Sequence, residues 1–162
     1  MEKYLATAAC LVLILAGAVA LPRLIEPEGQ GPDVVTVPSI VEAGSLQELS
    51  QQIGFEVTER FDLPFNAEET SYMSYWGELA ELHYSGEEQT AVYRQSIGTE
   101  DNSGDYDAYK DVTEITVNEM NITLKGNDGI YTLAVWTDGE YSYSLSLSSG
   151  VSENSWRSSL SH

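Results

Sequence analysis

The sequence contains a single cysteine, Cys10, which lies inside an apolar run near the N-terminus. One cysteine cannot form a disulfide within the chain, and a zinc-thiolate cluster needs more than one thiolate. No cysteine follows the apolar run, so a cysteine nucleophile is excluded from the rest of the chain. We therefore interpret Cys10 as a small apolar residue of the run.

Basic residues are also scarce. The chain has 7 Lys and Arg against 26 Asp and Glu, which gives a net charge of −19. Nucleic-acid binding depends on basic side chains that neutralise phosphates, so this composition predicts no nucleic-acid partner. It also disfavours docking on anionic lipid. It is compatible with a soluble extracellular domain, with cationic partners or with weak binding of divalent cations.

Motifs of catalysis and of cofactor binding are missing too. The sequence has no Gly-x-Ser-x-Gly motif and no glycine-rich phosphate or dinucleotide loop. Only two histidines are present to act as the general base that a serine nucleophile needs. Carboxylates are so abundant that pairs such as Glu78 with Glu81, or Glu87 with Glu88, are expected by chance. We therefore predict a non-catalytic protein without a cofactor.

The longest apolar run covers residues 4–21, about 18 residues, after a short start that contains Lys3. This length is close to the roughly 20 residues that span a bilayer. Two interpretations remain open: a signal peptide cleaved after Ala20, or a membrane anchor that stays in the chain. Both export the rest of the protein, so we expect an extracytoplasmic location, secreted or anchored. A helix buried in a soluble domain fits poorly with a position at the start of the chain.

Residues 22–38 are rich in Pro and Gly, which indicates an extended tether. The tether would separate the signal or anchor segment, residues 1–21, from a single domain at residues 39–162. The domain opens with a predicted helix that Ser45 caps together with Glu48 and that Gly54 ends. Three apolar residues share one face of this helix: Leu46, Leu49 and Ile53.

Strand signals dominate the rest of the domain. Short runs bounded by Gly, Asn or Asp are typical of antiparallel strands joined in a meander. The hairpin signal Asp138-Gly139 should join the last two strands. Asn118-Glu119 is the hairpin before it, although Glu tolerates positive φ poorly. The strands are predicted within residues 55–64, 71–86 with a bend or break at Gly77, 88–98, 112–126, 129–139 and 140–150.

A second helix closes the domain. Ser152 is its expected N-cap, and Val151 lies at staple spacing from Trp156. Trp156 and Leu160 are four residues apart, so both would dock on the sheet. The sequence therefore predicts an α+β fold, an antiparallel meander sheet with an N-terminal helix and a short C-terminal helix packed on it.

Serine occupies every second position of the last strand: Ser142, Ser144, Ser146 and Ser148. Side chains alternate between the faces of a strand, so the four serines share one face and Tyr/Leu residues share the other. Because the closing helix needs an apolar surface, we expect it on the Tyr/Leu face and the serines turned outward. The alternative is a ligand groove, since small hydroxylated side chains leave room for a bound molecule.

Aromatic residues are numerous on the predicted strands, where core packing is their usual role. The functional alternative is a Tyr/Trp platform that binds a peptide or a glycan. The residues that we predict to contact a ligand in that case are Tyr75, Trp76, Tyr84, Tyr93 and Trp136.

The acidic loop at residues 99–111 carries a weak signal for calcium. Asp101, Asp105 and Asp107 alternate as oxygen ligands do at the start of a calcium loop. The pattern then fails, because no Gly stands at its sixth position and Val112 replaces the twelfth-position Glu. A solvated acidic loop is the simpler interpretation. His83 is a lone histidine on a strand and does not by itself indicate a metal site.

The C-terminal half contains a set of structural motifs: Lys125-Gly126, then Ala134-x-Trp136-x-Asp138-Gly139, then Tyr143-x-Leu145 and the helix at 152–160. With Gln47–Phe55 and Leu63-Pro64 they resemble the pattern of the domain-of-unknown-function family numbered 4367, over about residues 39–160. The resemblance implies an exported domain of Gram-positive bacteria, sometimes attached to anti-sigma-factor-like proteins. The zinc-binding, sigma-factor-binding portion has no counterpart here, so we do not expect that kind of regulation.

These observations lead to one main hypothesis and two alternatives. The main hypothesis is a non-catalytic domain of the cell envelope that binds or senses a protein or a small ligand through its sheet. One alternative is a hydrolase of cell-wall material, which needs a carboxylate pair with a strongly raised pKa. The other is a purely structural domain with a sheet covered on both faces.

Overall fold

The computed structural model of the protein describes residues 40–161. The predicted signal or anchor segment at 1–21 and the predicted tether at 22–38 lie outside the described residues. Neither helix within residues 40–161 has the length and apolar character needed to cross a membrane.

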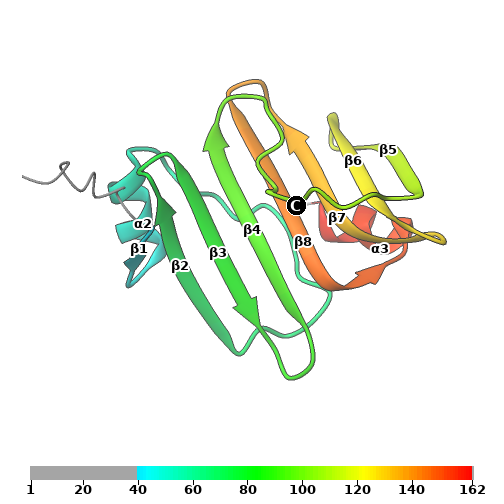
Figure 1. Ribbon diagram of the computed structural model, residues 1–162, viewed down its shortest axis with the longest axis horizontal. Coiled ribbons are helices and arrows are strands. Elements are labelled where there is room, and N and C mark those ends of the chain that lie inside the picture. Colours follow the sequence, from blue (N-terminus) through cyan, green and yellow to red (C-terminus); the bar gives the residue numbers. More distant parts are fainter. Residues whose placement is uncertain (1–39, 162) are drawn as a thin grey trace, which may run out of the picture. The chain divides into compact units, whose positions relative to one another are not determined.

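The domain is built on one antiparallel sheet of eight strands (Figure 1). The strand order is β1-β2-β3-β4-β8-β7-β6-β5, so the predicted meander is divided in two. After β4 the chain crosses to the far edge of the sheet, and β5 to β8 then return until β8 pairs with β4. The strands are β1 Ile40–Ala43, β2 Glu69–Tyr75, β3 Leu79–Ser85, β4 Thr90–Ile97, β5 Asp111–Val117, β6 Met120–Asn127, β7 Ile130–Thr137 and β8 Tyr141–Val151.

The first helix, α2 (Leu46–Ile53), has the N-cap and the glycine stop predicted for it, but not the reciprocal bond from Ser45 to Glu48. The Ser45 hydroxyl accepts a bond from the Glu48 backbone N–H at 3.2 Å, and Gly54 ends the helix in the left-handed region at φ 81°. The Glu48 carboxylate accepts from the Gly44 N–H rather than from Ser45. The short edge strand β1 comes before this helix, so the domain does not open with a helix as predicted.

The second helix, α3 (Glu153–Ser159), is also confirmed. The Ser152 hydroxyl accepts from the Ser155 N–H at 3.3 Å. Trp156 and Leu160 are both completely buried. The Trp156 indole N–H donates to the Tyr131 carbonyl at 3.0 Å, which satisfies its one polar atom inside the core.

The predicted strand at residues 55–64 is wrong. The segment lies across one face of the sheet without joining it, on the side where α3 also packs (Figure 1). Side chains take the place of a ladder: Gln95 accepts from the Thr58 N–H and donates to the Glu56 carbonyl, both at 3.0 Å. Phe55 and Val57, two apolar residues of the segment, are buried. This segment and α3 form the core layer over the sheet.

Both predicted hairpins are present. Asn118 and Glu119 have φ values of 48° and 68°, the left-handed pair that a tight hairpin needs. In the turn between β7 and β8, the two central residues are Gly139 and Glu140, one position later than the Asp138-Gly139 pair expected there. There the Asp138 N–H donates to the Tyr141 carbonyl at 3.2 Å, and Gly139 is the residue with positive φ, 97°.

We predict that Glu119→Gly stabilises the protein by about 0.5–1 kcal/mol. An L-residue in the left-handed region costs the folded state roughly 1–2 kcal/mol, and glycine removes this cost. Part of the gain is offset because glycine also gives the unfolded chain more conformational freedom. Urea unfolding would measure the difference. The matched control is Glu114→Gly on the extended backbone of β5, which should lower stability. An unfolding midpoint that falls for Glu119→Gly would contradict the strain assigned to this turn.

Candidate functional site

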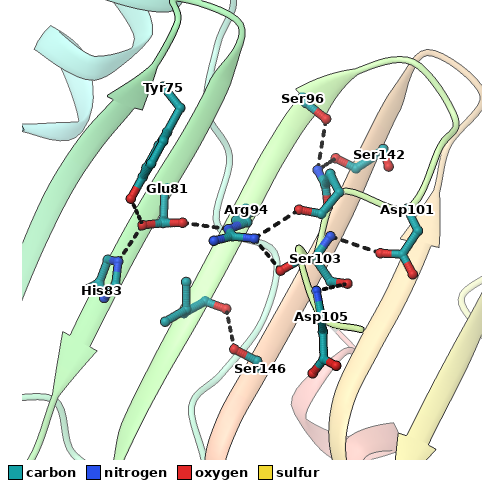
Figure 2. Close-up of polar contacts among 12 residues, drawn as sticks. Tyr75, Glu81, His83, Arg94, Ser96, Asp101, Ser103, Asp105, Ser142 and Ser146 are labelled. Atoms are coloured by element: carbon teal, nitrogen blue, oxygen red, sulfur yellow. Dashed lines mark hydrogen bonds and ion pairs between the residues drawn. The ribbon is translucent and has the colours of Figure 1, made fainter. Parts of the chain in front are cut away.

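The side of the sheet opposite the core layer, here called the second face, carries a polar cluster centred on Glu81 of β3. Glu81 is only 1% exposed. Its carboxylate accepts hydrogen bonds from the Tyr75 hydroxyl at 2.7 Å and from His83 Nε2 at 2.5 Å, and Arg94 Nε donates to it at 2.5 Å. Figure 2 shows the three donors around this carboxylate. We call these four residues the Glu81 cluster.

Strand geometry explains why the four side chains meet. Glu81 and His83 are two residues apart on β3, so they point to the same face. Arg94 is the register partner of Glu81 on β4. Tyr75 ends β2 and reaches the carboxylate from the other neighbouring strand. Three adjacent strands therefore place a buried charge and its donors with little freedom.

The cluster keeps Glu81 ionised. Burial by itself raises the pKa of Glu81, but the hydrogen bonds from His83, Tyr75 and Arg94 outweigh it and hold the pKa below its ordinary range. The same carboxylate raises the pKa of Tyr75 through their hydrogen bond. A carboxylic general acid needs the opposite shift. Glu81 therefore lends no support to the carboxylate hydrolase considered above.

Arg94 also ties the cluster to residues 98–110, here called the crossover, which runs over the second face (Figures 1 and 2). Its Nη1 donates to the Asn102 carbonyl at 3.4 Å and to the Ser103 carbonyl. The Asn102 amide in turn donates to Ser96 Oγ at 2.9 Å. One guanidinium thus joins the buried carboxylate on β3 to the backbone of the loop that follows β4.

The serine row was predicted to face outward, and half of it does not. Ser142 and Ser144 are 1% and 2% exposed, and the crossover lies over Ser142 (Figure 2). The Ser142 hydroxyl donates to the Glu100 carbonyl, and its own carbonyl accepts from the Asn102 amide at 2.8 Å. Ser148 at the other end is exposed. The small serine side chains let the crossover lie close to the sheet.

A groove opens beside the Glu81 cluster at the turn between β2 and β3. It has a volume of about 530 Å³. Trp76 on this turn is 60% exposed and has a φ of 54°, and Ile97 at the end of β4 is 68% exposed. The Trp76 ring lies 5.8 Å from that of Tyr75, which links the groove to the cluster. The Trp76 groove is lined by Trp76, Gly77, Glu78, Leu79, Ser96 and Ile97.

The five aromatic residues predicted to contact a ligand do not share one surface. Tyr84, Tyr93 and Trp136 are 5%, 1% and 7% exposed and face the core. Burial raises the pKa of both tyrosines far above the ordinary value. The void that Tyr93 and Trp136 line together has a volume of about 20 Å³, the space of one water molecule. Of the five residues predicted to form the platform, only the adjacent pair Tyr75 and Trp76 lies outside the core.

The calcium candidate also fails on geometry. Within residues 40–161 no three His, Cys, Asp or Glu side chains are placed to hold a metal ion. Asp101 pairs with Lys125 at 2.7 Å. Asp105 accepts from the Asp107 N–H at 2.8 Å and from the Tyr109 hydroxyl at 2.5 Å. These carboxylates hold the crossover in shape instead of converging on a cation.

From the sequence we named Glu81 only as a chance neighbour of Glu78 and did not consider Arg94, although a signal for the pair was present. The hairpin between β3 and β4 closes with a bond of 2.8 Å from the Gly86 N–H to the Gln89 carbonyl. Glu81 and Arg94 are each five residues from that closing pair, and so lie opposite each other. Predicting the hairpin register would therefore have predicted the ion pair.

We predict that Glu81→Gln lowers the free energy of unfolding by about 3 kcal/mol or more at pH 7, since it leaves Arg94 without its buried counter-charge. In the wild-type chain, Glu81 has a pKa below its ordinary 4.5 when folded. Its contribution is thus complete above about pH 5 and is lost as the pH falls through the folded value.

Urea unfolding at pH 7, 5 and 4 checks both statements. Wild-type stability should drop in acid more steeply than that of Glu81→Gln, which cannot titrate at this position. Arg94→Lys is the companion variant, because it keeps the positive charge but replaces the planar guanidinium and its several N–H donors by an ammonium group. Equal acid sensitivity of the wild type and Glu81→Gln would contradict the assignment.

Comparison with known proteins gives one family. Residues 58–155 match the family described as Domain of unknown function (DUF4367). Comparisons with curated proteins and with solved structures gave no match. The matched range spans more than half of the chain and includes the whole Glu81 cluster and every residue that lines the Trp76 groove. The chain therefore belongs to the DUF4367 family, as the resemblance of its motifs indicates.

Proposed function

We propose that the protein is a non-catalytic binding domain of the cell envelope that recognises its partner through the Trp76 groove. The observation that carries the proposal is the backbone conformation and the exposure of Trp76. A bulky side chain at positive φ is strained, and a large apolar side chain in water gains nothing for folding. Trp76 has both disadvantages, at φ 54° and 60% exposure. Backbone strain of this kind concentrates at functional sites.

The surroundings of Trp76 suit binding. Tyr75 lies against it, and the Tyr75 hydroxyl is fixed to the buried Glu81. Leu79 is the register partner of Tyr75 and lines the groove together with exposed Ile97. An exposed aromatic held by a rigid neighbour loses little entropy when a ligand covers it. Tryptophan and tyrosine are also the residues most often found at the energetic centre of interfaces.

An extracytoplasmic location is part of the proposal. It is supported by the apolar run at residues 4–21, the Pro/Gly-rich stretch after it and the strongly acidic composition. Sensing would then mean that a partner in the envelope binds the groove while the N-terminal segment directs or holds the domain there.

Photo-crosslinking in the native cells tests the proposal. A benzoylphenylalanine at position 76 keeps an aromatic ring in the groove, and the same group at Tyr106 is the control. Tyr106 is 97% exposed but lies on the crossover, outside the groove. We expect a defined adduct from position 76 and none from position 106. Equal adducts from both positions, or none from position 76, would refute binding at the groove.

A second prediction separates binding from folding. Asn adopts positive φ more readily than Trp, so Trp76→Asn should leave the free energy of unfolding within about 0.5 kcal/mol of the wild type, or raise it. With the crosslinker moved to Ile97, the same substitution should reduce the adduct about tenfold. Urea unfolding and adduct yield measure the two effects. An unchanged adduct would show that Trp76 has no part in recognition.

A further inference from the structure

We propose that the Trp76 groove binds a basic side chain, a lysine or an arginine of a partner protein or peptide, between the Trp76 indole and the Glu78 carboxylate. This inference rests on the proposed function and names the chemistry of its partner. It follows from the one charged residue and the aromatic ring that line the groove, and from the absence of an ion pair to that charge within residues 40–161.

The only charged residue among those that line the groove is Glu78, and it is exposed. No lysine, arginine or histidine within residues 40–161 forms an ion pair with Glu78. The nearby Arg94 is committed to Glu81 and to carbonyls of the crossover. The groove therefore presents an unneutralised negative charge to whatever enters it.

Trp76 supplies the second requirement of a site for a cation. The indole ring is the best aromatic partner for a lysine or arginine head group. The apolar side chains of Leu79 and Ile97 line the same groove. They can cover the methylene stem of a basic residue while its charged end stays near water. Aromatic face, apolar wall and carboxylate together match a long basic side chain better than a purely apolar one.

The charge of the whole chain favours the same class of partner. With 26 acidic and 7 basic residues, the protein attracts cations at long range and repels anionic ligands. A cation–π contact and an exposed ion pair are each weak. A single basic residue should thus bind weakly, and a partner with several basic residues would gain affinity from the surrounding field.

Titration of the full chain with short peptides tests the inference. The probe is the acetylated, amidated pentapeptide Gly-Gly-Lys-Gly-Gly, and the matched control replaces Lys by norleucine, which has the same stem and no charge. Nuclear magnetic resonance of the indole N–H groups reports on each tryptophan. Trp136 and Trp156 are 7% and 0% exposed, so a shift confined to Trp76 identifies the groove.

We expect the lysine peptide to shift the Trp76 signal and to bind at least threefold more tightly than the norleucine peptide at low salt. Glu78→Gln should remove most of that difference. Glu114→Gln changes the charge equally on β5, at the opposite edge of the sheet, and should leave the difference intact.

Equal affinity for the two peptides, or equal effects of Glu78→Gln and Glu114→Gln, would overturn the inference. That result would leave the proposed function standing if photo-crosslinking from position 76 still gives an adduct, because the groove would then bind a neutral partner. Absence of any adduct from position 76 would instead remove the proposed function and this inference together.

Discussion

The arrangement of the side chains and of the crossover on the second face of this domain depends on the ion pair between Glu81 and Arg94. A buried carboxylate is tolerated only with its donors in place, and here β2, β3 and β4 each provide one. Because Arg94 also binds carbonyls of the crossover, the same pair fixes the loop that covers Ser142. Because Tyr75 binds Glu81, the pair also supports the Trp76 groove.

Most local elements could be predicted from the sequence, since short-range chemistry decides them. Ser45 and Ser152 cap their helices, and Asn118-Glu119 turns a hairpin, with residues close in the chain. The errors have long-range causes. Residues 55–64 have the alternation of a strand, but several of their backbone groups bond to residues distant in sequence. Gln95 binds Glu56 and Thr58, and Ser159 binds Asp62. The burial of Ser142 similarly depends on a crossover whose path no local pattern indicates.

The candidate site was predictable in part. Tyr75 and Trp76 were chosen as aromatic residues, and both lie at the Glu81 cluster or the groove beside it, but the same criterion selected Tyr84 and Tyr93 of the core. Alternation along a strand separates faces without indicating which face is covered. Glu81 could not be recognised for another reason: among 26 acidic residues, composition cannot distinguish a carboxylate that three strands enclose.

The divided meander has a consequence for the order of folding. Strands β1 to β4 pair mainly with their neighbours in sequence, and so do β5 to β8. Each half of the sheet can therefore form by closing short loops. The seam between the halves pairs Ala91 with Leu147 and requires the closure of a much longer loop. Within the sheet, high contact order is thus concentrated at one seam, and docking of two preformed half-sheets there is the natural slow step. The Glu81–Arg94 pair belongs to the first half and can form before that step, ready to receive the crossover.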